Sequence, residues 1–235
     1  MTKENLANEI VNKFQNSLKD NKFILFISSD YYRVGVIFKK EENNIVQNFR
    51  FLIQKSLSVK KIYGFEKNIA FLDIEKIIVP ILGKNNLVAS DADYKNQLQT
   101  FKIVVEDNNQ LPAEGRKIEK EEDIEYVAEL FTKFYKEDAL PYFEHWNSVT
   151  VLYEYIKGKT EEELWDILGQ FAPMKKAVIL RLCNDSNYQD FMNDYYEKQK
   201  EYYEEDPEDI DNIRYYKASK ELKEVLDKTK PVYNV

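Results

Sequence analysis

Residues 33–54 read RVGVIFKKEENNIVQNFRFLIQ, which is two alternating apolar segments separated by a polar turn. The first segment places apolar side chains at Val34, Val36 and Phe38, and the second repeats that spacing from Phe49 to Ile53. A period of two residues is typical of a half-buried strand. The polar residues 41–44 between the segments favour a turn. This stretch therefore predicts two neighbouring antiparallel strands.

The residues before this stretch extend the pattern toward the N-terminus. The compact apolar run 23–27, followed by a turn at 28–30, predicts a third strand and hence a meander. An earlier helix is indicated by four apolar residues spaced four apart: Leu6, Ile10, Phe14 and Leu18. A turn at 20–21 should end this helix. Further strands are expected at 68–73 and 98–105, with a polar surface excursion at 83–97 between them.

The second half of the chain has helical periodicity. Acidic residues at 121–123 favour a helix start, because the helix dipole stabilises negative charge in the first turn. The sequence also predicts helix starts at Pro141 and Pro173, an N-cap at Ser148 and a capping box of Thr160 and Glu163. A long helix should begin near Tyr188, and a last helix should run from about Pro207 to Asp227. We therefore expect five to seven helices after the sheet.

The predicted fold class is α+β, with an N-terminal helix, an antiparallel sheet of four to six strands and a C-terminal helical half. Residues 110–117 contain Pro112 and Gly115 and mark the change of periodicity. They could form a domain boundary, but a small open sheet needs helices to cover its apolar face. We therefore expect one domain over 1–235, with a helix and meander at 1–111, a connecting loop at 112–118 and a helical subdomain at 119–235.

Composition limits the cellular setting and the classes of partner. The chain has 235 residues, 43% of them hydrophobic, which is enough for a core without cross-links. A single cysteine, Cys183, excludes an internal disulfide and favours a reducing compartment. We find no signal-peptide pattern and no apolar run near the roughly 20 residues that span a bilayer. The expectation is a cytoplasmic protein without a membrane partner.

Charge is distributed unevenly between the two halves of the sequence. Residues 1–118 carry 18 Lys/Arg and 14 Asp/Glu, a net charge of +4, whereas residues 119–235 carry 16 and 28, a net charge of −12. An acidic surface repels phosphate backbones, so nucleic-acid binding through the second half is not expected. The acidity could equally serve solubility alone.

No pattern of catalytic, metal-binding or cofactor-binding residues is recognisable. His145 is the only histidine, and no G-x-S-x-G elbow accompanies it, so we interpret it as a partly buried residue at a helix end. One histidine and one cysteine exclude most zinc geometries. The six glycines form neither G-x-x-x-x-G-K nor G-x-G-x-x-G. We predict no catalytic residue, no metal site and no cofactor.

A repeated tyrosine pattern stands above this background. Tyr188, Tyr195 and Tyr202 lie seven residues apart, two helical turns, with Tyr196 and Tyr203 beside them. Tyrosine is enriched at interfaces because it offers a large rigid surface with a polar tip. The predicted partner-binding residues are Tyr195, Tyr196, Glu201, Tyr202, Tyr203, Glu204 and Glu205, and a basic protein would suit their charge. An ordinary amphipathic helix with packed tyrosines is the alternative.

Three short motifs resemble a bacterial family of domains of unknown function. They are Ile53-Gln54-Lys55-Ser56, the segment from Phe65 to Asn68-Ile69-Ala70-Phe71, and Ala139-Leu140-Pro141-Tyr142-Phe143 with Ser148. The resemblance implies a helix and meander before a helical tail, and it transfers no catalytic residue. Some small bacterial proteins of this build are similar to immunity proteins, which block toxins.

The functional hypothesis is a non-enzymatic protein-binding protein, immunity-like, that acts through its acidic, tyrosine-rich helical half. Two alternatives stay open: an enzyme using carboxylates in a cleft between sheet and helices, and a structural subunit of a larger assembly. The sequence leaves the oligomeric state undetermined.

Overall fold

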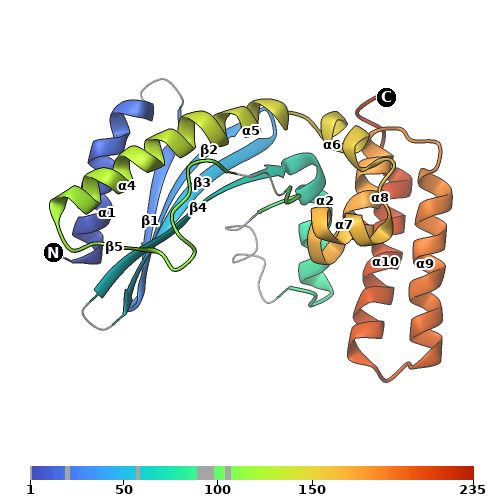
Figure 1. The fold of residues 1–235 in the computed structure, drawn as a ribbon. Helices are drawn as coiled ribbons and strands as arrows, with labels where there is room; N and C mark the ends of the chain where they lie inside the picture. Colours follow the sequence, from blue (N-terminus) through green and yellow to red (C-terminus); the bar gives the residue numbers. More distant parts are fainter. Residues whose placement is uncertain (1, 19–21, 57–58, 89–97, 104–106) are drawn as a thin grey trace. The chain divides into compact units, whose positions relative to one another are not determined.

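The computed structural model describes residues 2–18, 22–56, 59–88, 98–103 and 107–235. It shows the expected α+β fold, with an N-terminal helix, a five-stranded antiparallel open sheet and a helical C-terminal half (Figure 1). The chain divides into two compact units. The first comprises residues 1–69 and 104–145, and the second comprises residues 70–103 and 146–235. The single domain expected from the sequence stays a prediction.

The sheet of the first unit follows chain order, β1-β2-β3-β4-β5, as a meander does. Its strands are β1 (Ile24–Ser29), β2 (Arg33–Glu42), β3 (Ile45–Ser56), β4 (Val59–Phe71) and β5 (Arg116–Lys117). The last two residues of β4 belong to the second unit. Gly115, at φ +77°, turns the chain just before β5, where a Cβ would lie 3.0 Å from the Ile62 carbonyl oxygen.

The β2–β3 hairpin confirms the alternation in residues 33–54. Asn43 and Asn44 form its turn at φ 52° and 61°, a left-handed conformation that asparagine tolerates and that two-residue hairpins need. The register places Val36 opposite Phe51 and Phe38 opposite Phe49. The apolar side chains of both strands therefore lie on one face of the sheet.

Two helices cover that face within the first unit, α1 (Lys3–Phe14) and α4 (Glu121–Lys133) (Figure 1). The core between helices and sheet is aromatic. Phe14 lies 5.1 Å from Phe38, and Phe131 lies 5.6 Å from Phe49, measured between ring centres, and all four rings are buried. Rings at this spacing add specific geometry to the hydrophobic burial.

The N-terminal helix follows the predicted apolar stripe only in part. Leu6, Ile10 and Phe14 are fully buried, whereas Leu18 lies in a 3-10 turn (Gln15–Leu18) and is half-buried. The Thr2 side chain caps the helix by accepting a hydrogen bond from the Asn5 N–H. The turn predicted at residues 20–21 lies outside the described residues.

Pro141 does not start a new segment, contrary to the prediction. A π-helix (Phe134–Ala139) joins α4 to α5 (Leu140–His145), and the three form one continuous helical rod (Figure 1). The Leu140 N–H donates to the carbonyl of Tyr135, five residues back. Proline has no N–H and crowds the carbonyl four residues earlier. The wider π turn precedes the proline, and the rod continues past it.

The second unit is built mainly from helices. They are α2 (Leu72–Lys84), α6 (Val149–Ile156), α7 (Glu161–Leu168), a 3-10 turn (Gly169–Phe171), α8 (Ala172–Leu182), α9 (Tyr188–Glu205) and α10 (Ile210–Lys228). The predicted caps at Ser148 and Thr160 are confirmed. The last helix begins at Ile210 rather than Pro207, because the Asp209 carboxylate caps the N–H groups of Asp211 and Asn212.

Two predicted strands differ from the structure. The strand expected at 68–73 ends at Phe71, and helix α2 follows directly. This helix was not predicted, because it contains Pro80 and proline disfavours a helix interior. Residues 98–103 contain a single bridge residue, Phe101, instead of a strand, and residues 104–105 lie outside the described part. The predicted excursion at 83–97 starts as the end of α2, and residues 89–97 are not among those described.

Candidate functional site

A groove in the second unit lies between α7, α8 and α9. Its volume is about 320 Å³, and the residues that line it are mostly apolar. They are Glu161, Leu164, Trp165, Ala172, Pro173, Lys176, Phe191, Asp194, Tyr195, Lys198, Gln199 and Tyr202. Two of the predicted partner-binding residues, Tyr195 and Tyr202, are therefore part of a concave surface.

Local sequence signals place the helices around this groove. Thr160 and Glu163 form a capping box that begins α7, and Gly169 at φ +76° ends it. Pro173 lies in the first turn of α8, where a residue without a backbone N–H leaves no donor unsatisfied, and its side chain lines the groove. The 3-10 turn Gly169–Phe171 joins α7 to α8, and Trp165, which lines the groove, is 47% exposed.

The tyrosine stripe on α9 runs from the core to the surface. Tyr188 is buried and donates a hydrogen bond to Asp227 at 3.2 Å, and burial together with that carboxylate raises its pKa to about 12. Tyr195 is also buried, and burial raises its pKa. Tyr202 is 42% exposed. Of the three, Tyr202 therefore offers the most surface to a partner.

The two neighbouring tyrosines face α10 instead. The Tyr196 and Tyr216 hydroxyl oxygens lie 3.3 Å apart, and this hydrogen bond raises the pKa of Tyr196 to about 12. The ring of Tyr203 stacks on that of Tyr216 at 4.9 Å with an interplanar angle of 9°. Tyr196 and Tyr203 therefore hold the α9–α10 hairpin together.

The acidic residues cluster around the turn that joins α9 to α10, which Figure 1 shows as the lower end of the hairpin. Glu201, Glu204 and Glu205 are all exposed there. Residues 197–211 contain eight Asp/Glu and two Lys, a net charge of −6. The second unit as a whole has 23 Asp/Glu and 17 Lys/Arg, also −6. The net charge of the second unit therefore equals that of residues 197–211 alone, so negative potential is concentrated at the hairpin end.

A buried polar cluster in the second unit was not found from the sequence. The Lys175 ammonium donates to the carbonyls of Gln99, Thr100 and Leu168 at 2.8–3.1 Å. The Thr100 hydroxyl donates to Glu75 Oε1 at 2.7 Å. All three hydrogens of Lys175 are thereby used, so the cluster anchors residues 99–100 against the helices.

Glu75 itself is 1% exposed, and its Oε2 atom has no hydrogen-bond partner among the described residues. Burial raises the pKa of Glu75, while the Lys175 charge and the Thr100 hydrogen bond lower it. Burial likewise lowers the pKa of Lys175, and Glu75 raises it. Such paired shifts occur at functional sites and also in structural ion pairs. Lys175 lines a second pocket, of about 300 Å³, whereas Glu75 does not.

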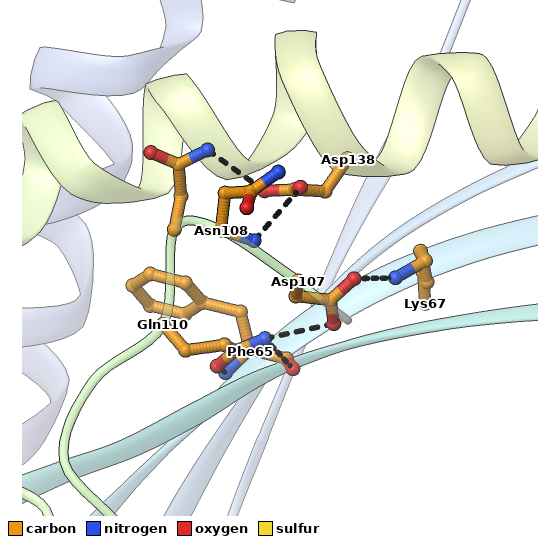
Figure 2. Close-up of polar contacts among 7 residues, drawn as sticks. Phe65, Lys67, Asp107, Asn108, Gln110 and Asp138 are labelled. Atoms are coloured by element: carbon orange, nitrogen blue, oxygen red, sulfur yellow. Dashed lines mark hydrogen bonds and ion pairs between the residues drawn. The ribbon is translucent and has the colours of Figure 1, made fainter. Parts of the chain in front are cut away.

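In the first unit, a polar cluster fastens residues 107–110 to β4 (Figure 2). The Gln110 amide accepts from the Phe65 N–H and donates to the Phe65 carbonyl, both at 2.9 Å, as a neighbouring strand would. Asp107 pairs with the buried ammonium of Lys67, which lies 5.5 Å from the ring centre of Phe134. These contacts satisfy the groups that β4 would otherwise bury unpaired.

The same segment is tied to the π-helix. Asp138 accepts from the Asn108 N–H at 3.1 Å and from the Asn109 amide at 2.9 Å, and Figure 2 shows Asp138 directed at the segment from the helical rod. Glu137 accepts a second bond from Asn109. Each carboxylate of this cluster is engaged by a donor. The arrangement is suited to holding a loop rather than to proton transfer.

Two further candidates from the sequence are His145 and Cys183. His145 is exposed at the end of α5, not partly buried as predicted. Cys183 is buried, and burial raises the pKa of its thiol to about 12, which disfavours the reactive thiolate form. Within the described residues, no three His, Cys, Asp or Glu side chains lie together as metal ligands would. No helix in the described part is both long and apolar enough to cross a bilayer.

No protein-family model, curated protein or solved structure matches the chain.

Proposed function

We propose that this chain is a non-enzymatic protein-binding protein that captures a basic partner at the α7–α8–α9 groove and the adjoining acidic end of the α9–α10 hairpin. One observation carries the proposal. Trp165 and Tyr202 expose nearly half of their side chains beside a mostly apolar groove. Exposed aromatic rings around a concavity are the residue types that dominate protein-binding energy.

The negative charges at the hairpin end favour a basic partner at the groove. A partner carrying Lys or Arg around an apolar anchor would meet the net −6 of residues 197–211 while its anchor enters the groove. Exposed charges act over about 8–10 Å at physiological ionic strength. They would therefore raise the association rate more than they slow dissociation, and salt would weaken the complex.

The motifs resemble a bacterial family of domains of unknown function, and the fold-level analogy of such proteins to immunity proteins suggests the identity of the partner. In this form of the proposal, the partner is a basic toxin that the chain blocks by binding. The single buried cysteine supports a reducing, cytoplasmic setting. The charge of the hairpin end argues against nucleic acid as the ligand of this surface.

The test is affinity capture from native lysate with the wild-type chain and two triple variants. Glu201→Lys/Glu204→Lys/Glu205→Lys reverses charge at the hairpin end. The control Glu114→Lys/Glu119→Lys/Glu129→Lys makes the same change in net charge at exposed sites of the first unit. We expect a basic protein to bind the wild type and the control, and to be lost from the hairpin variant and at high salt.

Retention of the captured protein by the hairpin variant, with the affinity of the wild type, would remove this surface from the account. Equal losses in both triple variants would show that net charge alone matters. Circular dichroism of the variants confirms that the helices remain folded, so that a loss can be assigned to the surface.

A further inference from the structure

Residues 98–103 form a strap that lies against the C-terminal end of α7 in the second unit. The Lys102 N–H donates to the Ile167 carbonyl at 2.6 Å, and the ring of Phe101 lies 5.3 Å from that of Trp146, measured between ring centres. Phe101 is buried, whereas Lys102 is exposed. The strap is therefore packed through one aromatic ring, and polar contacts hold the rest of it.

The ammonium group of Lys175 fastens this strap. Two of its hydrogen bonds go to strap carbonyls, those of Gln99 at 3.1 Å and Thr100 at 2.8 Å, and a third goes to the Leu168 carbonyl at the end of α7. Lys175 is only 5% exposed. An ammonium group has three hydrogens, so it cannot bond a further acceptor without leaving one of these carbonyls.

Glu75 is the acceptor that competes for this ammonium group. Its Oε1 atom accepts from the Thr100 hydroxyl, and the Thr100 carbonyl is bonded to Lys175, so one strap residue connects the two side chains. Its Oε2 atom is buried without a hydrogen-bond partner among the described residues. An ionised carboxylate in this position is a buried charge with an unsatisfied oxygen, and such a charge attracts a cation much more strongly than it would in water.

We propose that ionisation of Glu75 draws the Lys175 ammonium away from the strap carbonyls and so releases the strap, whereas protonated Glu75 leaves it fastened. The ammonium group is the two-state element, because it is bonded either to the strap or to Glu75. Gln99, Phe101 and Lys102 line the pocket of about 300 Å³ that Lys175 also lines. Release of the strap therefore removes part of the wall of this pocket.

The direction of the pH dependence follows from the burial of Glu75. Burial raises the pKa of Glu75 above 4.5, and the Lys175 charge and the Thr100 hydrogen bond oppose this rise. The strap is therefore fastened at acidic pH and released as the pH rises through the folded pKa. No strap residue lines the α7–α8–α9 groove, so this switch is separate from the proposed capture of a partner.

Lys175 is the charged side chain that acts on Glu75 from the elements packed against it. Its charge lowers the pKa of Glu75, and it lies on α8. Other charged side chains on α2, α8 and α10 are engaged by different groups, and these are Asp73, Lys84, Lys176, Arg181 and Glu221. We therefore assign the switch to the Glu75–Lys175 pair.

Hydrogen exchange of single backbone amides tests the release. The probe is the Lys102 N–H, and the reference is the Cys183 N–H, which is bonded to the Ile179 carbonyl at 2.9 Å at the buried end of α8. The ratio of their protection factors cancels a change in global stability, which affects both amides. Between pH 4.5 and about pH 9, this ratio should fall about tenfold in the wild type for each unit by which strap release lowers the pKa of Glu75.

Three variants assign the effect to the two side chains. Glu75→Gln keeps the shape of the side chain and cannot ionise, so its ratio should stay constant over the same pH range. Glu129→Gln, at an exposed position of the first unit, is the matched control and should follow the wild type. Lys175→Met removes the ammonium group, so its strap should be loose, with a low ratio at every pH.

The proposal fails if the ratio in the wild type does not change with pH. It also fails if the ratio falls equally in Glu75→Gln, because deprotonation of Lys175 or of another group would then release the strap. A strap that is as protected in Lys175→Met as in the wild type at acidic pH would show that the ammonium group does not fasten it. If Lys175→Met does not fold, the comparison of the wild type with Glu75→Gln decides alone.

Discussion

At the scale of single residues, Glu75 is the least expected feature of the molecule. It lies on α2 with its carboxylate buried, one oxygen bonded to the Thr100 hydroxyl and the other without a partner among the described residues. A buried carboxylate without full hydrogen bonding is costly to ionise. Its folded pKa is therefore raised, and protonation of Glu75 is linked to folding.

Glu75→Gln should remove this linkage. Because the folded pKa of Glu75 lies above its unfolded value of 4.5, the stability it contributes is complete below pH 4.5 and is lost as pH rises through the folded pKa. Between those values the free energy of unfolding of the wild type should fall relative to that of Glu75→Gln by about 1.4 kcal/mol per pH unit. Urea unfolding at a series of pH values measures the difference.

The exposed Glu129→Gln is the control for this measurement. Its stability should stay parallel to that of the wild type across the same pH range. If Glu75→Gln also stays parallel to the wild type, the Glu75 carboxyl is not stabilised in its protonated form by folding, and the interpretation of the cluster is wrong.

The tyrosines show how far single residues could be predicted. Their spacing of seven correctly placed them along one helix, but spacing cannot say what lies beside each turn of that helix. Tyr195 and Tyr202 line the groove, whereas Tyr196 and Tyr203 contact Tyr216, twenty and thirteen residues further along the chain. Glu75 had no sequence signal, because its burial results from the packing of residues distant in the chain.

At the scale of elements, α7 depends on its N-terminal cap. The Thr160 hydroxyl accepts from the Glu163 N–H at 3.3 Å, and the Glu163 carboxylate accepts from the Thr160 N–H at 2.8 Å. Lys159 adds an ion pair with Glu163 at 2.9 Å. Since Trp165 follows within this short helix, fraying of α7 would also disturb the rim of the groove.

Thr160→Ala should lower the free energy of unfolding by about 1 kcal/mol, because it leaves an N–H of the first turn unsatisfied. Chemical denaturation measures the change. The control Glu162→Ala, at an exposed position of the same turn, should stay within about 0.5 kcal/mol of the wild type. Equal stability of Thr160→Ala and the wild type would contradict the assignment of the capping box.

Elements with a local signal were predictable, and elements that break a local rule were not. The β2–β3 hairpin, the caps at Ser148 and Thr160 and the start of α8 follow from residues close together in the chain. Helix α2 contains Pro80, and the rod from α4 to α5 passes Pro141. A proline lowers the local helix propensity, but tertiary packing can maintain a helix that contains one.

At the scale of the whole molecule, the charge asymmetry seen along the sequence takes a different form. The halves 1–118 and 119–235 carry net charges of +4 and −12, whereas the two compact units carry −2 and −6. The difference arises because the acidic segment 119–145 belongs to the first unit. What remains distinctive is local, the net −6 of residues 197–211. This concentration beside an aromatic groove is the basis of the proposed function.

The most direct measurement of that function is the affinity of the captured partner for three single variants. Trp165→Ala and Tyr202→Ala remove the exposed rings at the groove, and Tyr126→Ala removes a ring of similar exposure, 46%, in the first unit. Loss of a binding hot spot costs at least 2 kcal/mol, so each groove variant should weaken binding about 30-fold or more. Tyr126→Ala should bind as the wild type does. Unchanged affinity of both groove variants would contradict the account.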